Sequence, residues 1–365
     1  MVEIPASLLP NDLHFASGPS KVRQEAISAL QNNLIIGSSH RKKPFLNMVE
    51  ELFDGIKQLY KLPSDYEIII GNGGTTLFWD ALVHSVIRKK SQHLSFGEFS
   101  NKFSGVVKKA PFLDDPSVIT SDFGSAPVAI EEEGIDAYCL THNETSTGVQ
   151  TKIVRPSSND DALVLVDATS AAGAIELDFT QTDIYYFAPQ KAFSSEGGLF
   201  MAFCSPKAVE RIEEIASSDR YIPDMLNLKT ALDNSRKFTT YNTPSVTTLL
   251  LLKSQVDFVN EKGGISWADE YTKMNSNLIY EWADSNSKTF PYVEKTFRSQ
   301  VTCTINFDGI DADDVAKHLR ANGILDVESY RKIGQNQLRI ATFPSIESED
   351  VQALIKCIDY VVENM

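Results

Sequence analysis

Residues 185–193, which read YYFAPQKAF, carry an aromatic run of strand character directly into a lysine, Lys191. A strongly hydrated ammonium group is costly to place beside such rings, and burial of this kind lowers the pKa of a lysine until its amine becomes nucleophilic. Schiff-base chemistry with a carbonyl compound requires an amine in that state. The ordinary alternative is a surface lysine whose aliphatic stem covers apolar side chains while its charge stays in water.

A carboxylate precedes this lysine in the sequence, at the end of the apolar run ALVLVDAT. The run has the length and β-branched content of a buried strand, and Asp167 lies at its end. Because ligands of open α/β sheets bind at the carboxyl ends of strands, we expect Asp167 and Lys191 to face one crevice. An acid for a pyridinium nitrogen and a lysine for an aldehyde are the pair that pyridoxal phosphate requires. The alternative for Asp167 is a helix cap or a turn.

The stretch GNGGTT, residues 71–76, separates a predicted strand from a predicted helix. Free N–H groups at such a helix N-terminus form an anion site, to which Thr75 and Thr76 add hydroxyl groups. The stretch matches neither the P-loop nor the G-x-G-x-x-G pattern, so a nucleotide or dinucleotide is not its expected ligand. The expected ligand is a single phosphate group.

Positive charge is concentrated in the loop GSSHRKKPF, residues 37–45. Arg41 has the planar fork that suits a phosphate or a carboxylate, and His40 precedes it; a solvated basic loop is the ordinary alternative. Arg339 lies inside the otherwise apolar run QLRIATF, and Arg331 precedes that run. A buried arginine must be paired or must bind an anionic ligand, so Arg339 is a candidate for substrate binding.

Two further strand ends carry candidate cofactor contacts. HLSFGEFSNKF predicts a short strand, a turn at Gly97 and a helix whose first turn bears Phe99. The flat ring of Phe99 could stack on a planar cofactor, although aromatic side chains more often belong to the core. The strand-like run AYCLTH leads into NETSTG, which places Thr145 on the same predicted side of the sheet.

Alternating strands and helices must position these residues. Helical spacing predicts a helix over residues 45–60, and another helix is predicted to begin at Pro19 and to stop at Gly37. EGGLFMAFC predicts a turn and a strand that closes the sheet. The periodicity weakens over residues 223–242, which predicts a loop or an arm that crosses to a partner subunit. Helices and a few strands from about Gly264 onwards predict a second, smaller α/β layer.

Composition excludes several classes of protein. The 365 residues include 34 basic and 49 acidic side chains, and the net charge of −15 disfavours nucleic acid and anionic membranes as partners. The sequence has no apolar run that approaches the length of a membrane-spanning helix. The four cysteines are far apart and form no C-x-x-C pair, so neither a metal site nor a disulfide framework is indicated. We expect a soluble, cytoplasmic protein without an export signal.

The ordered motifs GNGGTT, HNETSTG, VDATSAAG, YYFAPQKAF and YNTPS resemble those of the class V, fold-type I pyridoxal-phosphate aminotransferases. More narrowly, the chain is similar to the phosphoserine aminotransferase family in the form typical of actinobacteria, nearly from end to end. The resemblance implies an α/β fold with a large mixed-sheet domain and a smaller C-terminal α/β domain. The implied boundaries are 16–255 for the large cofactor-binding domain and 256–365, together with 1–15, for the small domain.

The resemblance also implies roles for particular residues. Lys191 would form the Schiff base with pyridoxal phosphate, and Asp167 would pair with the pyridinium nitrogen. The implied cofactor-binding set is Thr75, Thr76, Phe99, Thr145, Asp167, Gln190, Lys191, Asn242 and Thr243, of which the last two would reach the cofactor of the other subunit in a homodimer. The implied substrate-binding set is His40, Arg41 and Arg331 for the distal anion and Arg339 for the α-carboxylate.

The implied reaction is amino transfer from glutamate to 3-phosphohydroxypyruvate, which gives O-phosphoserine and 2-oxoglutarate in serine biosynthesis. Two positions depart from the better-known bacterial branch, because Thr76 stands where that branch has an arginine and Tyr330 where it has a histidine. Both positions lie near the expected phosphate of the substrate. A phosphorylated four-carbon oxo acid of vitamin B6 biosynthesis is a second expected substrate.

Three other functions are compatible with parts of this pattern. A cysteine desulfurase or similar lyase of the same fold requires a nucleophilic thiol on a mobile loop, and no cysteine lies in an obvious Gly/Ser-rich loop. A non-catalytic protein with this fold is disfavoured by the retained Lys191 and Asp167. A nicotinamide dehydrogenase would carry G-x-G-x-x-G after the first strand, and this sequence does not.

Overall fold

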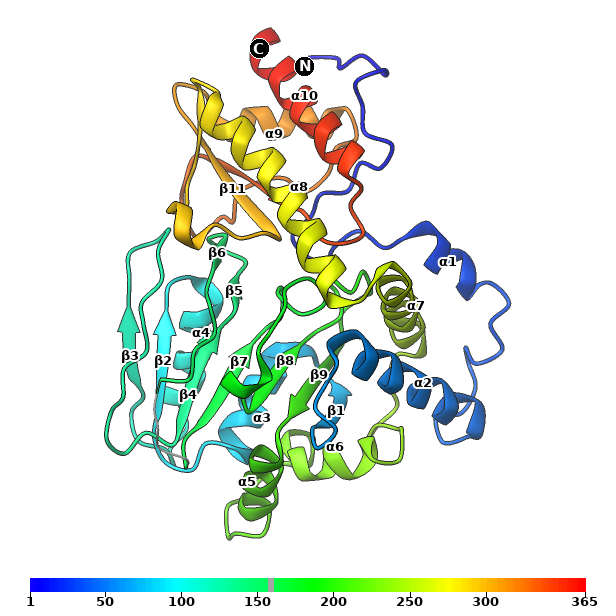
Figure 1. Cartoon of the computed structure of the whole chain (residues 1–365), viewed down its shortest axis with the longest axis vertical. Helices are drawn as coiled ribbons and strands as arrows, with labels where there is room; N and C mark the ends of the chain where they lie inside the picture. The colour runs from blue at the N-terminus through cyan, green and yellow to red at the C-terminus, as the bar shows by residue number, and fades with distance from the viewer. Residues whose placement is uncertain (157–160) are drawn as a thin grey trace.

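The computed structural model describes residues 1–156 and 161–365, and a seven-stranded sheet forms its centre (Figure 1). The strand order is β1-β9-β8-β7-β4-β2-β3, in which β9 runs antiparallel to both of its neighbours and the other neighbouring pairs are parallel. This mixed sheet confirms the predicted α/β fold class. The strands are β1 (Glu67–Asn72), β2 (Ser91–Ser95), β3 (Ser117–Thr120), β4 (Ala137–Thr141), β7 (Leu163–Asp167), β8 (Ile184–Phe187) and β9 (Leu199–Cys204).

Helices cover both faces of this sheet, which explains why its central strands are apolar throughout. Successive side chains of a strand point to opposite faces, so Tyr185 and Phe187 of β8 join one core and Ile184 and Tyr186 join the other. The first core includes α2 (Lys43–Tyr60) and α7 (Val246–Lys262). The second core includes α3 (Gly74–Ser85), α4 (Glu98–Lys108), α5 (Pro206–Ala216) and α6 (Leu228–Ser235).

A second, antiparallel sheet of order β10-β11-β12 lies beyond the long helix α8 (Figure 1). Its strands are β10 (Thr289–Pro291), β11 (Thr302–Phe307) and β12 (Gln337–Ala341), and its helices are α8 (Ile265–Ser285), α9 (Ala312–Ala321) and α10 (Ser348–Asn364). The first residues of the chain pack here, because the N–H of Val2 donates to His318 Nδ1 at 2.7 Å and that of Ile4 to Asn322 Oδ1 at 2.9 Å. The predicted boundary at 255/256 falls within the continuous helix α7, and the division into domains stays a prediction.

Three expectations about the elements were wrong. The strand predicted in EGGLFMAFC, which is β9, does not lie at the edge of the large sheet. It lies inside that sheet, between β1 and β8. Residues 223–242 are not only a loop, since they contain α6, whose start is capped by the side chain of Asn227. Helix α1 (Gln24–Leu30) begins later than Pro19, since Ser20 instead hydrogen-bonds to the carbonyls of residues 190 and 191, and it ends well before Gly37.

Short elements were also missed at the edge and above the sheet. These are the edge strand β3 and the hairpin of β5 (Asn143–Glu144) and β6 (Val149–Gln150). Strands of two to four residues carry too little alternation to be recognised from sequence. No helix in the described part of the chain is both long and apolar enough to span a membrane.

Candidate active site

A cavity of about 130 Å³ opens where parallel strands of the large sheet end. It is lined by Thr75, Thr76, Trp79, Phe99, Thr141, Asn143, Thr145, Asp167, Thr169, Gln190 and Lys191. The lining comes from segments at or after the ends of β1, β2, β4, β7 and β8, which meet at one edge of the sheet. Seven residues that the sequence singled out therefore share one cavity: Thr75, Thr76, Phe99, Thr145, Asp167, Gln190 and Lys191.

Lys191 lies four residues after β8 and is enclosed by the turn at Gly18. Its ammonium nitrogen donates a hydrogen bond to the carbonyl oxygen of Ser17, and its own carbonyl accepts one from the hydroxyl of Ser20. A Cβ atom on Gly18 would lie 1.9 Å from Lys191 Nζ, and Gly18 has φ +137°, so no other residue fits there. Burial and, to a smaller extent, the charge of Arg339 lower the pKa of Lys191 to about 7, against the opposing effects of Asp167 and Glu144. The amine is therefore substantially neutral near neutral pH, as a nucleophile or base requires.

Asp167 is the last residue of β7, and both of its carboxylate oxygens are held. Oδ1 accepts hydrogen bonds from the N–H of Thr169 at 2.9 Å and from its hydroxyl at 2.6 Å. These two bonds form the turn that was the alternative role for Asp167. Oδ2 accepts a hydrogen bond from the indole N–H of Trp79 at 3.1 Å. Burial raises the pKa of Asp167, and these hydrogen bonds oppose the rise by favouring the ionised form.

The predicted anion site falls at the N-terminus of α3. The helix begins at Gly74, and the residue before it, Gly73, has no side chain to cap the free N–H groups. Thr75 and Thr76 follow in the first turn, both on the wall of the cavity. Nearby, the buried side-chain oxygen of Gln190 has no hydrogen-bond partner among the described residues. This wall therefore offers hydrogen-bonding groups without protein partners to a bound polar ligand.

These groups fit pyridoxal phosphate. The cavity combines an amine of lowered pKa, a buried carboxylate, an aromatic ring, an unpartnered amide oxygen and an uncapped helix N-terminus. The cofactor presents an aldehyde, a ring nitrogen, a flat ring and a phosphate, and each of these four has a chemical counterpart in the cavity. Lys191 would hold the aldehyde carbon, Asp167 the ring nitrogen and the start of α3 the phosphate.

Four predicted residues lie outside this cavity, in a separate group at the end of β1. The guanidinium of Arg41 donates to the carbonyl of Tyr241 at 2.8 Å, and the side chain of Asn72 donates to Asn242 Oδ1 at 2.8 Å and to the carbonyl of Thr243 at 3.0 Å. His40 precedes Arg41, and its buried Nε2 has no hydrogen-bond partner among the described residues. Burial lowers the pKa of His40, and the charge of Arg41 acts in the same direction.

The two remaining arginines differ in their surroundings. Arg339 lies in β12 and donates to the carbonyl of Thr145 at 3.3 Å, while its Nε atom is buried without a partner among the described residues. Its guanidinium carbon lies 5.3 Å from the ring centre of Tyr330, which itself lies 5.8 Å from that of Phe99. Arg331 is exposed on the turn that follows Tyr330 and does not line the cavity.

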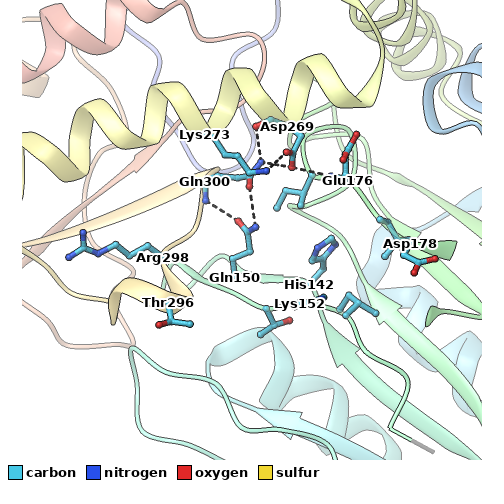
Figure 2. A pocket seen from close by; sticks show the side chains of 14 residues that line it. His142, Gln150, Lys152, Glu176, Asp178, Asp269, Lys273, Thr296, Arg298 and Gln300 are labelled. Carbon is cyan, nitrogen blue, oxygen red and sulfur yellow. Dashed lines mark hydrogen bonds and ion pairs between the residues drawn. The ribbon is translucent and has the colours of Figure 1, made fainter. Parts of the chain in front are cut away.

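A larger hollow of about 370 Å³ lies between the β5–β6 hairpin and α8, and Figure 2 shows its side chains. Its polar groups mainly satisfy one another, since Gln300 donates to Asp269 at 3.0 Å and accepts from Gln150 at 3.1 Å, and Lys273 pairs with Asp269 (Figure 2). Burial lowers the pKa of His142 on its wall to about 4, so that imidazole is neutral near pH 7. This hollow is therefore lined by polar contacts between α8 and the segments around the β5–β6 hairpin, and it is not the candidate active site.

Sequence reasoning missed two residues that shape the cavity. Trp79 was included in a helix without a role, although it lies four residues after Thr75 and therefore on the same face of α3. Gly18 carries no local signal of its function, because the lysine that it contacts is distant in the sequence.

The comparisons with known proteins agree with this geometry. The model of the aminotransferase class-V family matches residues 117–331, more than half of the chain. The phosphoserine aminotransferase of Rhodococcus opacus is 50% identical over 99% of this chain and 98% of its own. The crystal structure of a phosphoserine aminotransferase from Cytophaga hutchinsonii superposes with a TM-score of 0.87 at 26% identity over 96% of this chain and 99% of that chain. A pyridoxal-phosphate-bound phosphoserine aminotransferase from Trichomonas vaginalis, 18% identical, has the same fold with a TM-score of 0.79 over 95% of this chain and 99% of that chain.

The chain therefore belongs to the class-V aminotransferase family and is a transaminase that depends on pyridoxal phosphate. Within that family it belongs with the phosphoserine aminotransferases, as the resemblance of its motifs indicated.

The cysteines disfavour the desulfurase alternative. Cys139, Cys204, Cys303 and Cys357 are all buried, and burial raises the pKa of each thiol, to about 12 for Cys303 and about 11 for Cys357. A nucleophilic cysteine requires the opposite, an accessible thiol with a lowered pKa.

Proposed function

We propose that this protein transfers the amino group of L-glutamate to 3-phosphohydroxypyruvate, producing O-phospho-L-serine and 2-oxoglutarate for serine biosynthesis in the cytoplasm. The observation that carries the proposal is the convergence of Lys191, Asp167 and the N-terminus of α3 on one cavity. Its support is the 50% identity, over nearly the whole length, to an enzyme named for this activity. Use of a second substrate in vitamin B6 biosynthesis stays a prediction.

Lys191 and Asp167 have different roles in the reaction. Pyridoxal phosphate, when bound, supplies the electron sink that stabilises negative charge at the α-carbon of an amino acid. Lys191 binds the cofactor and, once released, moves the proton at that carbon, a task for which a pKa of about 7 suits it. Asp167 holds a proton on the ring nitrogen, since its ionised carboxylate stabilises the positive charge there.

The other walls hold and orient the cofactor. Thr75, Thr76 and the N–H groups of α3 would bind the phosphate, and Phe99 would pack on the ring. Gln190 would contact the phosphate or the ring oxygen, and Thr145 the hydroxyl side of the ring. Each of these side chains lines the cavity. The roles follow from the chemistry of each group, because a helix N-terminus binds anions and an aromatic face packs on a flat ring.

The purified protein tests this directly. It should be yellow, its absorbance should shift when glutamate is added, and 3-phosphohydroxypyruvate should restore the first spectrum while phosphoserine forms. A colourless protein that takes up no pyridoxal phosphate would contradict the whole proposal. A coloured protein that reacts with glutamate but not with this oxo acid would contradict only the assigned acceptor.

The group at the end of β1 supports a homodimer with shared active sites. His40, Arg41, Asn242 and Thr243 carry donors suited to anions but do not line the cavity of their own chain. Several apolar side chains are exposed in the same region of the sequence, including Leu34 at 93% and Ile36 at 42%. We propose that these four residues complete the site of the partner subunit, where Asn242 and Thr243 reach the cofactor phosphate.

Mixed dimers test the shared site. Chains with Lys191→Ala and chains with both Asn242→Ala and Thr243→Ala should each be inactive alone, because each lacks one half of every site. A heterodimer contains one site with both halves intact, so mixing should restore up to about half of the wild-type activity per heterodimer. Subunit exchange is verified with two affinity tags, and verified exchange without recovered activity would exclude a shared site.

Arg41 is proposed to bind the distal anion of both substrates, the γ-carboxylate of glutamate and the phosphate of the oxo acid. A charge-assisted hydrogen bond contributes about 1.5–3 kcal/mol, so Arg41→Ala should lower kcat/KM for both substrates by roughly tenfold or more. Arg41→Lys should recover only part of this loss, because lysine keeps the charge but loses the planar fork.

The matched control is the pair alanine and pyruvate, which have no distal anion. Both should be poor substrates of the wild type and nearly indifferent to the substitution. Steady-state kinetics decides the question, and an unchanged kcat/KM for 3-phosphohydroxypyruvate would mean that residues 37–45 form only a solvated loop.

A further inference from the structure

Glu144 is a fully buried carboxylate whose hydrogen-bond partners are all uncharged N–H and O–H groups. Oε2 accepts from the backbone N–H of Phe99 at 3.1 Å and from that of Ser100 at 2.8 Å. Oε1 accepts from the N–H of Ser146 at 3.1 Å and from its hydroxyl at 2.7 Å. Its exposed fraction is 0%, and no ion pair joins it to a lysine or arginine in the described ranges. A buried charge is costly without compensation, so the N-terminus of α4 must provide it.

The start of α4 is built to receive this carboxylate. Its N-cap residue is Gly97, which has no side chain to satisfy the free N–H groups of the first turn. A Cβ atom at Gly97 would lie 2.3 Å from Glu144 Cγ and 2.7 Å from Ser146 Oγ. The hydroxyl of Ser146 also accepts from the N–H of Glu98 at 2.9 Å. The cap of α4 is therefore supplied by a segment more than forty positions away, and glycine is required at 97 by that close approach.

This cap connects three groups of the active site. Phe99 lies in the capped turn and lines the cavity. Thr145, the next residue after Glu144, also lines the cavity, and its carbonyl accepts the hydrogen bond from Arg339. A movement of the Glu144 carboxylate would therefore displace the stacking ring, a polar contact and the substrate-binding arginine together.

We propose that Glu144 is a positioning residue that fixes the first turn of α4 to the β5–β6 hairpin and so holds Phe99 and Thr145 at the cofactor site. The inference rests on the roles proposed above for Phe99, Thr145 and Lys191, and it goes beyond them by giving Glu144 two separable effects. The first effect is geometric, through its four hydrogen bonds. The second is electrostatic, through its charge.

The electrostatic effect has a defined sign. Asp167 lines the same cavity as Lys191 and, with Glu144, raises the pKa of the amine, whereas the charge of Arg339 and the larger effect of burial lower it. Removal of the Glu144 charge removes one of the two opposing contributions. The pKa of Lys191 should therefore fall below its value of about 7 in the wild type.

Two variants separate the effects. Glu144→Gln removes the charge and nearly keeps the shape, although its NH₂ group cannot accept hydrogen bonds. Gly97→Ala keeps the charge but forces the carboxylate away from the helix, and its backbone, with φ −178°, tolerates alanine without strain. Asp183→Asn is the control for a buried carboxylate away from the site, because Asp183 accepts from the N–H of Val164 at 2.8 Å, pairs with Arg155 and does not line the cavity.

The first measurement is the dissociation constant of pyridoxal phosphate for each full-length variant. Glu144→Gln and Gly97→Ala should both weaken binding by roughly tenfold or more, the scale of lost hydrogen bonds to a charged group.

The second measurement is the pH at which Lys191 reaches half of its full reactivity towards an acylating reagent in the cofactor-free chain. Peptide mass spectrometry follows the acylation of Lys191. This midpoint should fall in Glu144→Gln, move less in Gly97→Ala and stay at the wild-type value in Asp183→Asn.

The outcomes distinguish this inference from the proposed function. Wild-type affinity in a folded Gly97→Ala chain would overturn the geometric effect even if Glu144→Gln did not fold. If both variants bound the cofactor more weakly but Lys191 became half-reactive at the same pH in both, the electrostatic effect would be overturned. Cofactor attached to a lysine other than Lys191 in the wild type would instead contradict the proposed function.

Discussion

Lys191→Ala is expected to abolish transamination while the chain remains folded. Alanine removes both the amine that binds the cofactor and the base that moves the proton, so activity should fall by roughly 10⁴-fold or more. The folded state should tolerate the change, because the amine makes one hydrogen bond, to the carbonyl of Ser17, and its burial in the charged form is unfavourable. Loss of one such bond costs about 1 kcal/mol.

The attachment site can be identified without relying on activity. Borohydride reduction of the wild-type protein, digestion and mass spectrometry should locate the cofactor on the peptide that contains Lys191. Lys21→Ala is a suitable control, because the side chain of Lys21 is only 12% exposed but pairs with Asp12 outside the cavity. Label on any other lysine, or full activity in Lys191→Ala, would contradict the assignment.

Asp167→Asn should produce the second-largest loss, and the loss should appear in the rate rather than in binding. The amide carries no negative charge, so the proton on the ring nitrogen is no longer stabilised. Its NH₂ group must also face one of the donors that now surround the carboxylate, from Thr169 or Trp79. Removal of a preorganised electrostatic contact typically lowers the rate by about 10²–10³-fold.

Single-turnover measurements with glutamate separate the two quantities. The rate of the half-reaction should fall by roughly a hundredfold or more, whereas the dissociation constant of glutamate should change little, because Arg339 and the distal anion site are unaltered. Asp183→Asn provides the control for the loss of a buried carboxylate outside the cavity, at the residue before β8. If the half-reaction of Asp167→Asn kept its rate, the role of Asp167 would be limited to the turn that it closes with Thr169.

The sequence by itself determined the elements that depend on near neighbours. The helical spacing of apolar residues over 45–60 corresponds to α2, and the strand, glycine turn and helix at 66–85 correspond to β1 and α3. Asp167 and Lys191 could be paired from sequence because parallel strands deliver the residues at their carboxyl ends to one edge of a sheet. Periodicity and strand ends are local properties, so they can be predicted from one sequence.

Only the tertiary structure decided how distant segments meet. The apolar run of β9 indicates a strand but not its place between β1 and β8, since any buried strand has the same composition. The fit of Gly18 against Lys191 joins positions 173 residues apart, and the cap of α4 by Glu144 joins positions more than forty apart. His40 and Arg41 carry the charge of a substrate site, yet they lie beside residues 241–243 and not beside Lys191. Each of these contacts depends on the register of the sheet and the path of the connecting loops, because local side-chain preferences do not specify which distant backbone will lie opposite them.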